Sequence, residues 1–253
     1  RKRIERVWDI NWSLYNNQIN YPDKLRWQHR GYVPKIAEMV DGKKTLLSQS
    51  ILKANGLYFN AVPYGLNGQT GLFADTINRL LRFLLDDMNF DDLILPPQLV
   101  MAQLGLACLK TYPVRDSNAR LSHVVEPVSC WNIYPDPMNR QKYIIHLSYQ
   151  DLSEFREETL RDGSPYDKSV VRQIKEDFRS DTKGDLEDAA RREGLDPSSS
   201  GRKFVERGEY WGFIDDPGTG ERLHTGIVME VVNRKYLIRP PQPTPFPKKM
   251  HPF

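Results

Sequence analysis

Cysteine is scarce in this 253-residue chain, and long apolar runs are absent. The two cysteines, Cys108 and Cys130, show no CxxC spacing, so the sequence suggests neither a disulfide framework nor a structural zinc site. We expect both to be reduced thiols in the core. No run approaches the roughly 20 apolar residues that span a bilayer, and the start, Arg1–Glu5, lacks the apolar region of a signal peptide. We therefore expect a protein that is neither membrane-embedded nor exported by a signal peptide.

The familiar catalytic motifs are missing as well. No HxH or HxxxH spacing would place two of the five histidines on one metal ion. The histidines are His29, His123, His146, His224 and His251. Ser117 and Ser129 have no GxSxG-type turn around them, and Cys130 has no telling partner in the sequence. We expect all of these residues to be structural.

Composition limits the class of protein but names no partner. Hydrophobic residues make up 39% of the chain and charged residues 27%, which is typical of a soluble globular protein. At this length the chain can bury a core as one large domain or two small ones. The net charge of +3 is far from the concentrated positive charge of a dedicated nucleic-acid binder.

Three pairs of adjacent aspartates are the best candidates for metal chemistry: Asp86–Asp87, Asp91–Asp92 and Asp215–Asp216. Clustered carboxylates are the ligands with which two-metal nucleases hold Mg²⁺. Aspartates are also favoured at helix ends and in turns, where they bond backbone amides. We favour that second interpretation.

Two further patterns are compatible with phosphate binding. The segment Gly65–Gly71 precedes a strong helix, whose N-terminal amides can hold a phosphate, but it lacks the GK[ST] ending of a P-loop. The start of the chain combines basic residues with tryptophans, as phosphate-backbone contacts do: Arg1, Lys2, Arg3, Arg6, Trp8 and Trp12. We favour a plain loop for the first pattern and a solvated helix face for the second.

Apolar periodicity predicts mainly helices at the start of the chain. We expect helices over 4–19 and 23–32, a helix or turn within 35–61, and an extended stretch around 57–59. The strongest helix runs from Leu72 to Asp87. Its apolar face is expected to be core or a subunit interface: Phe73, Ile77, Leu80, Leu81, Leu84 and Leu85.

Strands become frequent after residue 105. Pro96 begins a short helix that breaks near Gly105, and strands are expected over 106–114, 121–126 and 142–147. Asp151, with Glu154 three residues later, predicts a capped helix to about residue 161. Ser164–Pro165 predicts the start of another helix. Further strands are expected over 209–214, 225–232 and 236–239.

These elements predict an α+β fold in three portions. Residues 1–163 form helices and strands, 164–203 form a charged helical insertion or linker, and 204–253 form an antiparallel β segment with a proline-rich exit. Large apolar residues almost vanish from 180–203, which we expect to be partly mobile. The chain has no initiator methionine and ends in a proline-rich connector, so we expect an internal piece of a longer protein.

The proline-bracketed segment Glu126–Pro137 is the most informative part of the chain. Each Xaa-Pro step at Tyr134-Pro135 and Asp136-Pro137 pushes the residue before the proline out of the helical region, so the chain must extend and turn. The Asp136 carboxylate can then bond nearby backbone amides. Trp131, Ile133 and Tyr134 would anchor this turn on the core.

The order of short phrases around this segment resembles that of a known family. Val125-Glu126-Pro127 and Tyr134-Pro135-Asp136-Pro137 precede the strand-like run Tyr143–Leu147 and the helix start Leu152-Ser153-Glu154-Phe155. An alanine- and glycine-marked passage comes before them at Ala102–Lys110. A Glu-x-Trp strand and a Pro-Phe exit come after them, at Glu209-Tyr210-Trp211 and at Leu237–Arg239 onward to Pro252-Phe253. Over most of residues 30 to 253 the chain is similar to the bacteriophage portal (head-to-tail connector) family.

The resemblance implies a structural role. It implies a portal-like wing of helices on a small mixed or antiparallel sheet, with the stem and clip absent from this chain. Portal subunits form a ring, usually of twelve copies, at one capsid vertex, and double-stranded DNA passes through its channel during packaging and ejection. The ring contacts the major capsid and scaffolding proteins and docks the large terminase, then head-completion and tail adaptor proteins.

The resemblance also implies what the chain does not do. It implies no enzyme, no catalytic, cofactor-binding or metal-binding residue and no membrane, with the protein assembled in the host cytoplasm into the virion. It identifies no DNA-contacting residue. Two alternatives stay open: a Mg²⁺-dependent phage nuclease that uses Asp86, Asp87, Asp91 or Asp92, and another α+β minor head protein of the virion.

Overall fold

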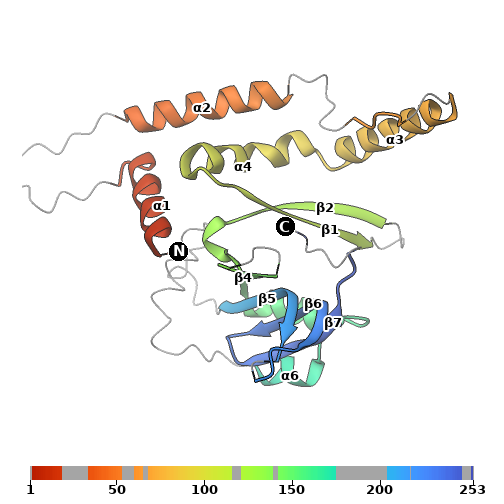
Figure 1. Ribbon diagram of the computed structural model, residues 1–253. Helices are drawn as coiled ribbons and strands as arrows, with labels where there is room; N and C mark the ends of the chain where they lie inside the picture. Colours follow the sequence, from red (N-terminus) through yellow and green to blue (C-terminus); the bar gives the residue numbers. More distant parts are fainter. Residues whose placement is uncertain are drawn as a thin grey trace, which may run out of the picture. The chain divides into compact units, whose positions relative to one another are not determined.

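A computed structural model describes residues 2–18, 34–52, 60–64, 68–115, 121–138, 142–174, 204–216, 218–246 and 252 (Figure 1). The chain divides into two compact units, which we call unit 1 (Arg1–Cys130) and unit 2 (Trp131–Pro252). Each unit is described by itself. No helix within the described ranges is long and apolar enough to cross a membrane.

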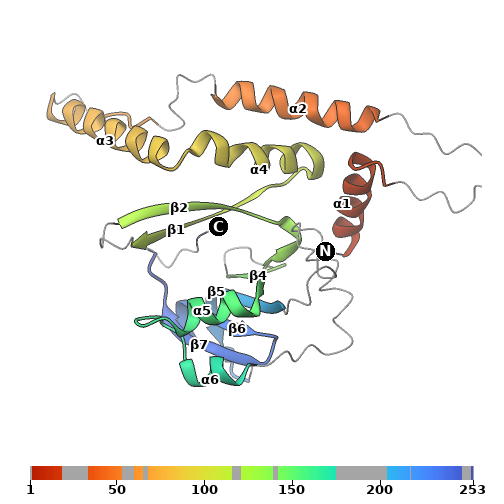
Figure 2. The same cartoon turned by 180° about the vertical axis from the view of Figure 1, so that it is seen from behind.

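Unit 1 combines helices with a two-stranded hairpin. Its helices are α1 (Lys2–Tyr15), α2 (Lys35–Leu52), α3 (Gly68–Asp87) and α4 (Phe90–Leu104). The hairpin pairs β1 (Cys108–Arg115) antiparallel with β2 (Leu121–Val128). Helix α4 contacts α1, α2, α3 and β2, and it runs beside α2 in both views of the fold (Figures 1 and 2). It is therefore the element around which unit 1 is assembled.

The predicted helices of unit 1 are present with shifted ends. Helix α3 contains all of the predicted 72–87 and begins four residues earlier, and α1 ends before the predicted residue 19. The ambiguous stretch after residue 35 is helical as α2. The helix predicted over 23–32 and the extended stretch around 57–59 lie outside the described residues.

Helix α4 begins earlier than the sequence predicts. Pro96 was expected at its start, but the helix begins at Phe90, so Pro96 and Pro97 lie inside it. Asp91 and Asp92 in the first turn favour this earlier start because carboxylates stabilise the positive end of a helix dipole. The predicted end is confirmed: Gly105 is left-handed with φ 80°, and its N–H donates to the Met101 carbonyl at 2.9 Å.

Unit 2 is a five-stranded antiparallel sheet with two helices. The strands lie in the order β3 (Ile133–Pro135), β4 (Tyr143–Asp151), β5 (Phe204–Asp215), β6 (Arg222–Val232) and β7 (Tyr236–Pro243). A short 3-10 helix, η1 (Cys130–Asn132), precedes β3, and α5 (Leu152–Leu160) and α6 (Lys168–Gln173) follow β4. The predicted α+β class, with a β-rich C-terminal part, is confirmed.

Aspartates begin both helices of unit 2. Asp151 caps α5 as predicted, because its side chain accepts the Ser153 N–H at 2.8 Å. The prediction for the next helix was wrong: Asp167 caps α6 through Ser169 N–H at 2.9 Å. Ser164 instead donates its hydroxyl proton to the Thr159 carbonyl at 2.6 Å. Its side chain is therefore used to close the end of α5.

The core of unit 2 joins both helices to the sheet. Helix α5 contacts β4 and β5, and α6 contacts β7. The buried cluster consists of Leu152, Phe155, Val171, Ile174, Val205, Val232 and Ile238. Val171 and Ile174 belong to the block 164–203 that the sequence assigns to an insertion or linker, so its first residues are part of the core. Residues 175–203 lie outside the described ranges.

The sheet of unit 2 also crosses the expected division at residue 163. Strand β4 comes before that position and β5 after residue 203, yet they pair along their length, from Tyr143 opposite Gly212 to Asp151 opposite Phe204. The boundary between the compact units falls after Cys130. Periodicity along the chain cannot show such a pairing, because it joins segments that are far apart in sequence.

The β4–β5 pairing predicts a strict requirement for glycine at position 212. Gly212 has φ 147°, and a Cβ there would lie 2.3 Å from the Lys142 carbonyl oxygen and 2.6 Å from Tyr143 Cα. Gly212→Ala should therefore lower the free energy of unfolding of unit 2 by about 3 kcal/mol, because the two backbones must separate.

Gly208→Ala in the same strand is the matched control. A Cβ at Gly208 meets Leu147 Cδ2 at 3.4 Å, which is ordinary contact, so this change should cost less than about 1 kcal/mol. Urea unfolding followed by circular dichroism measures both variants. Equal losses of stability would contradict the close approach at Gly212.

Candidate functional site

The segment that carries the family resemblance ends in a turn after β3 whose aspartate, Asp136, is buried. Asp136 is only 5% exposed, and its Oδ1 accepts a hydrogen bond from the Met138 N–H at 2.9 Å. The Asp136 N–H donates to the Tyr143 carbonyl at 3.0 Å. The predicted bond between the Asp136 carboxylate and a nearby amide is confirmed. By bonding the Met138 amide, the carboxylate holds the chain in its turn after β3. Ile133 of β3 is buried next to this turn in sequence.

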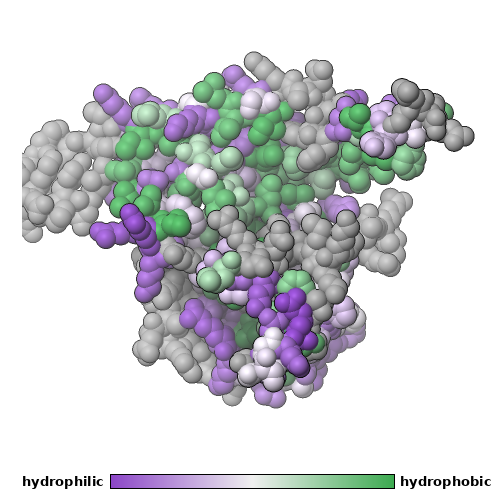
Figure 3. Space-filling model, viewed as in Figure 1, coloured by the Kyte–Doolittle hydropathy of each residue, from purple (hydrophilic) through white to green (hydrophobic). Residues whose placement is uncertain are grey.

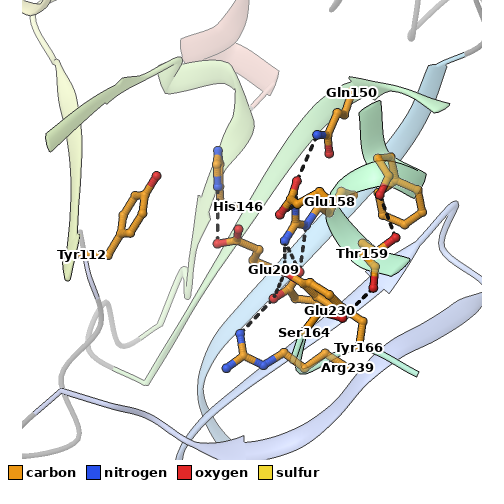
Figure 4. A network of polar contacts seen from close by, with 12 residues as sticks. Tyr112, His146, Gln150, Glu158, Thr159, Ser164, Tyr166, Glu209, Glu230 and Arg239 are labelled. Carbon is orange, nitrogen blue, oxygen red and sulfur yellow. Dashed lines mark hydrogen bonds and ion pairs between the residues drawn. The ribbon is translucent and has the colours of Figure 1, made fainter. Parts of the chain in front are cut away.

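A network of charged side chains lies on β5, β6 and β7 of unit 2 (Figure 4). We call it the Arg207 network. Glu230 is 2% exposed and accepts hydrogen bonds from Arg207 Nε at 2.8 Å and Arg239 Nη1 at 3.0 Å. Arg207 Nη1 also donates to Glu158 of α5 at 3.1 Å. The Arg207 guanidinium lies 5.3 Å from the centre of the Tyr166 ring and donates to its hydroxyl.

Arg207 and Tyr166 of this network both keep their protons near neutral pH. Burial by itself lowers the pKa of the Arg207 guanidinium. The negative charges around it, that of Glu230 most of all, have a larger opposite effect and raise that pKa above its ordinary value. Burial likewise raises the pKa of the Tyr166 phenol. Neither group can exchange a proton at physiological pH. The Arg207 network is therefore suited to joining strands and helix α5, and unsuited to acid–base catalysis.

A second polar group in unit 2 joins neighbouring strands. His146 of β4 and Glu209 of β5 are directly opposite one another, and Nδ1 of His146 lies 3.7 Å from Oε2 of Glu209. The Trp211 indole N–H donates to the same oxygen at 3.1 Å. All three residues are buried. A histidine beside a carboxylate is a common acid–base pair, but a substrate needs access to the imidazole, and this side chain is only 6% exposed.

The aspartate pairs lie at the ends of elements. Asp86–Asp87 ends α3 and Asp91–Asp92 lies in the first turn of α4. Asp215 at the end of β5 pairs with Lys142 at 2.7 Å and Arg222 at 2.9 Å. Oδ1 of Asp216 accepts the Gly218 N–H at 2.7 Å in the following turn. Within the described part of the chain, no three His, Cys, Asp or Glu side chains lie together in a way that could hold a metal ion.

The remaining candidates are scattered. His123 is exposed on β2, Ser129 lies between β2 and η1, and His29, His251 and Ser117 fall outside the described residues. Gly65 belongs to a stretch outside them too, whereas Gly71 lies in α3 and not in a loop. The structure therefore does not bring the described ones among these candidates into one site.

The basic start of the chain is a helix face. Lys2, Arg3 and Arg6 are exposed on α1, which buries none of its residues. The same helix exposes three large apolar side chains, and Trp8 and Trp12 are partly buried. The apolar residues are Ile4, Val7 and Ile10. Helix α1 thus presents both charged and apolar surface.

The apolar face predicted on the strongest helix is only partly core. Leu85 and Ala74 are buried, but Phe73 is 68% exposed and Leu80 55% exposed. The face was predicted to be core or a subunit interface: its buried residues are core, and an interface at its exposed residues stays a prediction. Figure 3 shows apolar side chains at the surface over α2 and α4 as well as α3. Met39 and Leu46 of α2 and Met101 of α4 are exposed.

Sequence reasoning missed the Arg207 network and the closeness of the two cysteines. Glu230 interrupts the otherwise apolar run Ile227–Val232, and a lone charge in such a run indicates a buried, paired carboxylate. Cys108 and Cys130 are both free thiols. Cys130 is buried, as expected, whereas Cys108 is partly exposed. The two consecutive strands predicted over 106–114 and 121–126 were the available signal.

Comparison with models of known protein families and with curated proteins found no match. The likeness to portal proteins therefore rests on the sequence phrases between Val125 and Phe155 and on their flanking strands. Assignment to that family stays a prediction.

The Arg207 network predicts a large effect of removing one buried charge. Glu230→Gln keeps the size of the side chain but leaves Arg207 and Arg239 without their shared carboxylate. The free energy of unfolding of unit 2 should fall by about 3 kcal/mol, because breaking a buried ion pair leaves uncompensated charge in the interior. Urea unfolding at neutral pH measures the change.

Asp162→Asn is the control for an exposed ion pair. Asp162 is fully exposed and pairs with Lys168 at 2.7 Å, and such pairs are screened by water and salt. No change in the unfolding curve is expected. If Glu230→Gln and Asp162→Asn lowered the free energy of unfolding by similar amounts, the burial of Glu230 would not be the reason that its ion pairs stabilise the fold.

Proposed function

We propose that this chain is a structural subunit of a ring-shaped bacteriophage portal at the capsid vertex. Double-stranded DNA would pass through the ring during packaging and ejection. The single observation that carries the proposal is the ordered set of phrases from Val125 to Phe155, resembling those of portal proteins. Two of these phrases have local structural roles, because Asp136 fixes the turn before β4 and Asp151 caps α5.

The character of the polar residues supports a scaffold rather than an enzyme. Glu230 and Asp136 are buried and hydrogen-bonded within unit 2. A portal subunit must keep its shape while DNA moves through the ring and partner proteins bind, and buried hydrogen-bonded groups of this kind would make it rigid.

Exposed apolar surface on unit 1 supports assembly. On α3, four large apolar side chains fall within about 100° of the helix circumference. They are Leu72, Phe73, Leu80 and Phe83. Contiguous exposed apolar patches mark interaction sites, and a closed ring needs contacts between two different surfaces of each subunit.

The partners of such a ring follow from the proposal. They are further copies of this chain, the major capsid and scaffolding proteins, the large terminase, and later head-completion and tail adaptor proteins. The site of action would be the portal vertex of the virion, after assembly in the host cytoplasm. These assignments of partners and location depend on the family resemblance.

Ring formation is the test of this function. The full-length chain at high concentration should give closed rings in negative-stain electron micrographs. Replacing Phe73 and Leu80 by glutamate should abolish them, because charge on the apolar stripe of α3 opposes burial. Arg82→Glu is the matched control and should leave rings intact, because Arg82 is exposed on the same helix and lies about 80° around its circumference from the nearest residue of the stripe. Monodisperse monomers of the unmodified chain, with no rings, would overturn the proposal.

The rival proposal is a Mg²⁺-dependent nuclease. Asp86, Asp87, Asp91 and Asp92 flank the two-residue turn between α3 and α4, which is the observation in its favour. Incubation of the purified chain with duplex DNA and Mg²⁺ should leave the DNA intact. Cleavage that disappears when these aspartates are replaced by asparagine would favour the nuclease. A different minor head protein would appear in the virion without forming rings.

A further inference from the structure

The only two cysteines of the chain meet at the base of the β1–β2 hairpin. Cys108 opens β1, and its partner across the hairpin is Val128. Cys130 lies two residues beyond Val128, at the start of the short 3-10 helix η1 that follows β2. The Cys130 thiol donates to the carbonyl of Leu106, two residues before Cys108, at 3.3 Å. The fold thus brings together two thiols that are 22 positions apart in sequence.

The two thiols differ in access and in acidity. Cys130 is 2% exposed, whereas Cys108 is partly exposed. The neighbouring Cys130 thiol lowers the pKa of Cys108, against the opposing effect of burial, and the neighbouring Cys108, together with burial, raises the pKa of Cys130. Cys108 is therefore the accessible sulfur with more thiolate character, and Cys130 is the protonated neighbour.

We propose that Cys108 and Cys130 form a reversible intramolecular disulfide when the protein meets hydrogen peroxide. In the first step the Cys108 thiolate attacks one peroxide oxygen, the O–O bond breaks, and hydroxide leaves to become water. In the second step the Cys130 sulfur, losing its proton, attacks the Cys108 sulfenic acid and displaces a second water. Overall, two thiols lose two protons and two electrons, and one peroxide is reduced to two waters.

The disulfide would tie the start of β1 to the residue that ends unit 1. It closes the loop from Cys108 to Cys130, which contains the whole hairpin. Closing a loop of this length restricts the unfolded chain, so the oxidised protein should unfold several degrees above the reduced one. This modification does not depend on the proposed portal function.

The test uses the reduced, full-length chain at low concentration. After a short exposure to a small excess of hydrogen peroxide, intact-mass spectrometry should show a monomer lighter by two hydrogen atoms. Thiol titration in denaturant should fall from two thiols per chain to none, and dithiothreitol should restore both. Because the chain has no other cysteine, that mass change identifies the Cys108–Cys130 bond.

Two single variants separate the roles of the sulfurs. Cys130→Ser should accumulate a sulfenic acid on Cys108 that dimedone traps, and Cys108→Ser should leave Cys130 unmodified by the same peroxide treatment. Iodoacetamide should alkylate Cys108 in the first variant at least about tenfold faster than Cys130 in the second. The proposal is overturned if peroxide leaves both thiols of the unmodified chain free while it oxidises glutathione in the same tube. Sulfinic acid without a disulfide, or disulfide only between chains, would overturn it equally.

Discussion

Unit 2 depends on strand β5, which must pair on both edges while it buries charged side chains. Its partner β4 approaches so closely at Gly212 that a single methyl group has no space. The same strand carries Arg207 and Glu209, whose burial is tolerable only because Glu230, Glu158 and Trp211 supply hydrogen-bond partners. Every element of unit 2 that packs on β5 therefore has to supply either an apolar surface or a matching charge.

Local signals predicted much of the fold. The i, i+3 and i+4 spacing identified α3, Gly105 identified the end of α4, and Asp151 identified the start of α5, because each depends only on residues within a turn or two. The start of α4 was missed because Pro96 usually opens a helix but lies inside this one. The start of α6 was missed because Asp167 offered the backbone a better cap than Ser164.

The candidate sites were harder to predict, for the same physical reason. The bond from Asp136 to the Met138 amide spans two residues, so the proline pattern alone predicted it. The ion pair of Arg207 with Glu230 spans 23 residues and needs the register of β5 on β6. The meeting of Cys108 and Cys130 needs the β1–β2 register. Long-range pairing creates these groups, and no sequence window contains both partners.

A contrast between the two units supports the proposed function. Unit 2 satisfies its buried charges internally, which suits a rigid body, whereas unit 1 leaves apolar side chains such as Phe73 and Leu80 exposed. A subunit of a closed ring combines those properties, because it must keep its shape and also bury surface against its neighbours. Native mass spectrometry over a range of protein concentrations tests this account most directly. A single assembly with a fixed number of subunits is predicted, and a monomer at every concentration, or an open-ended ladder of oligomers, would contradict it.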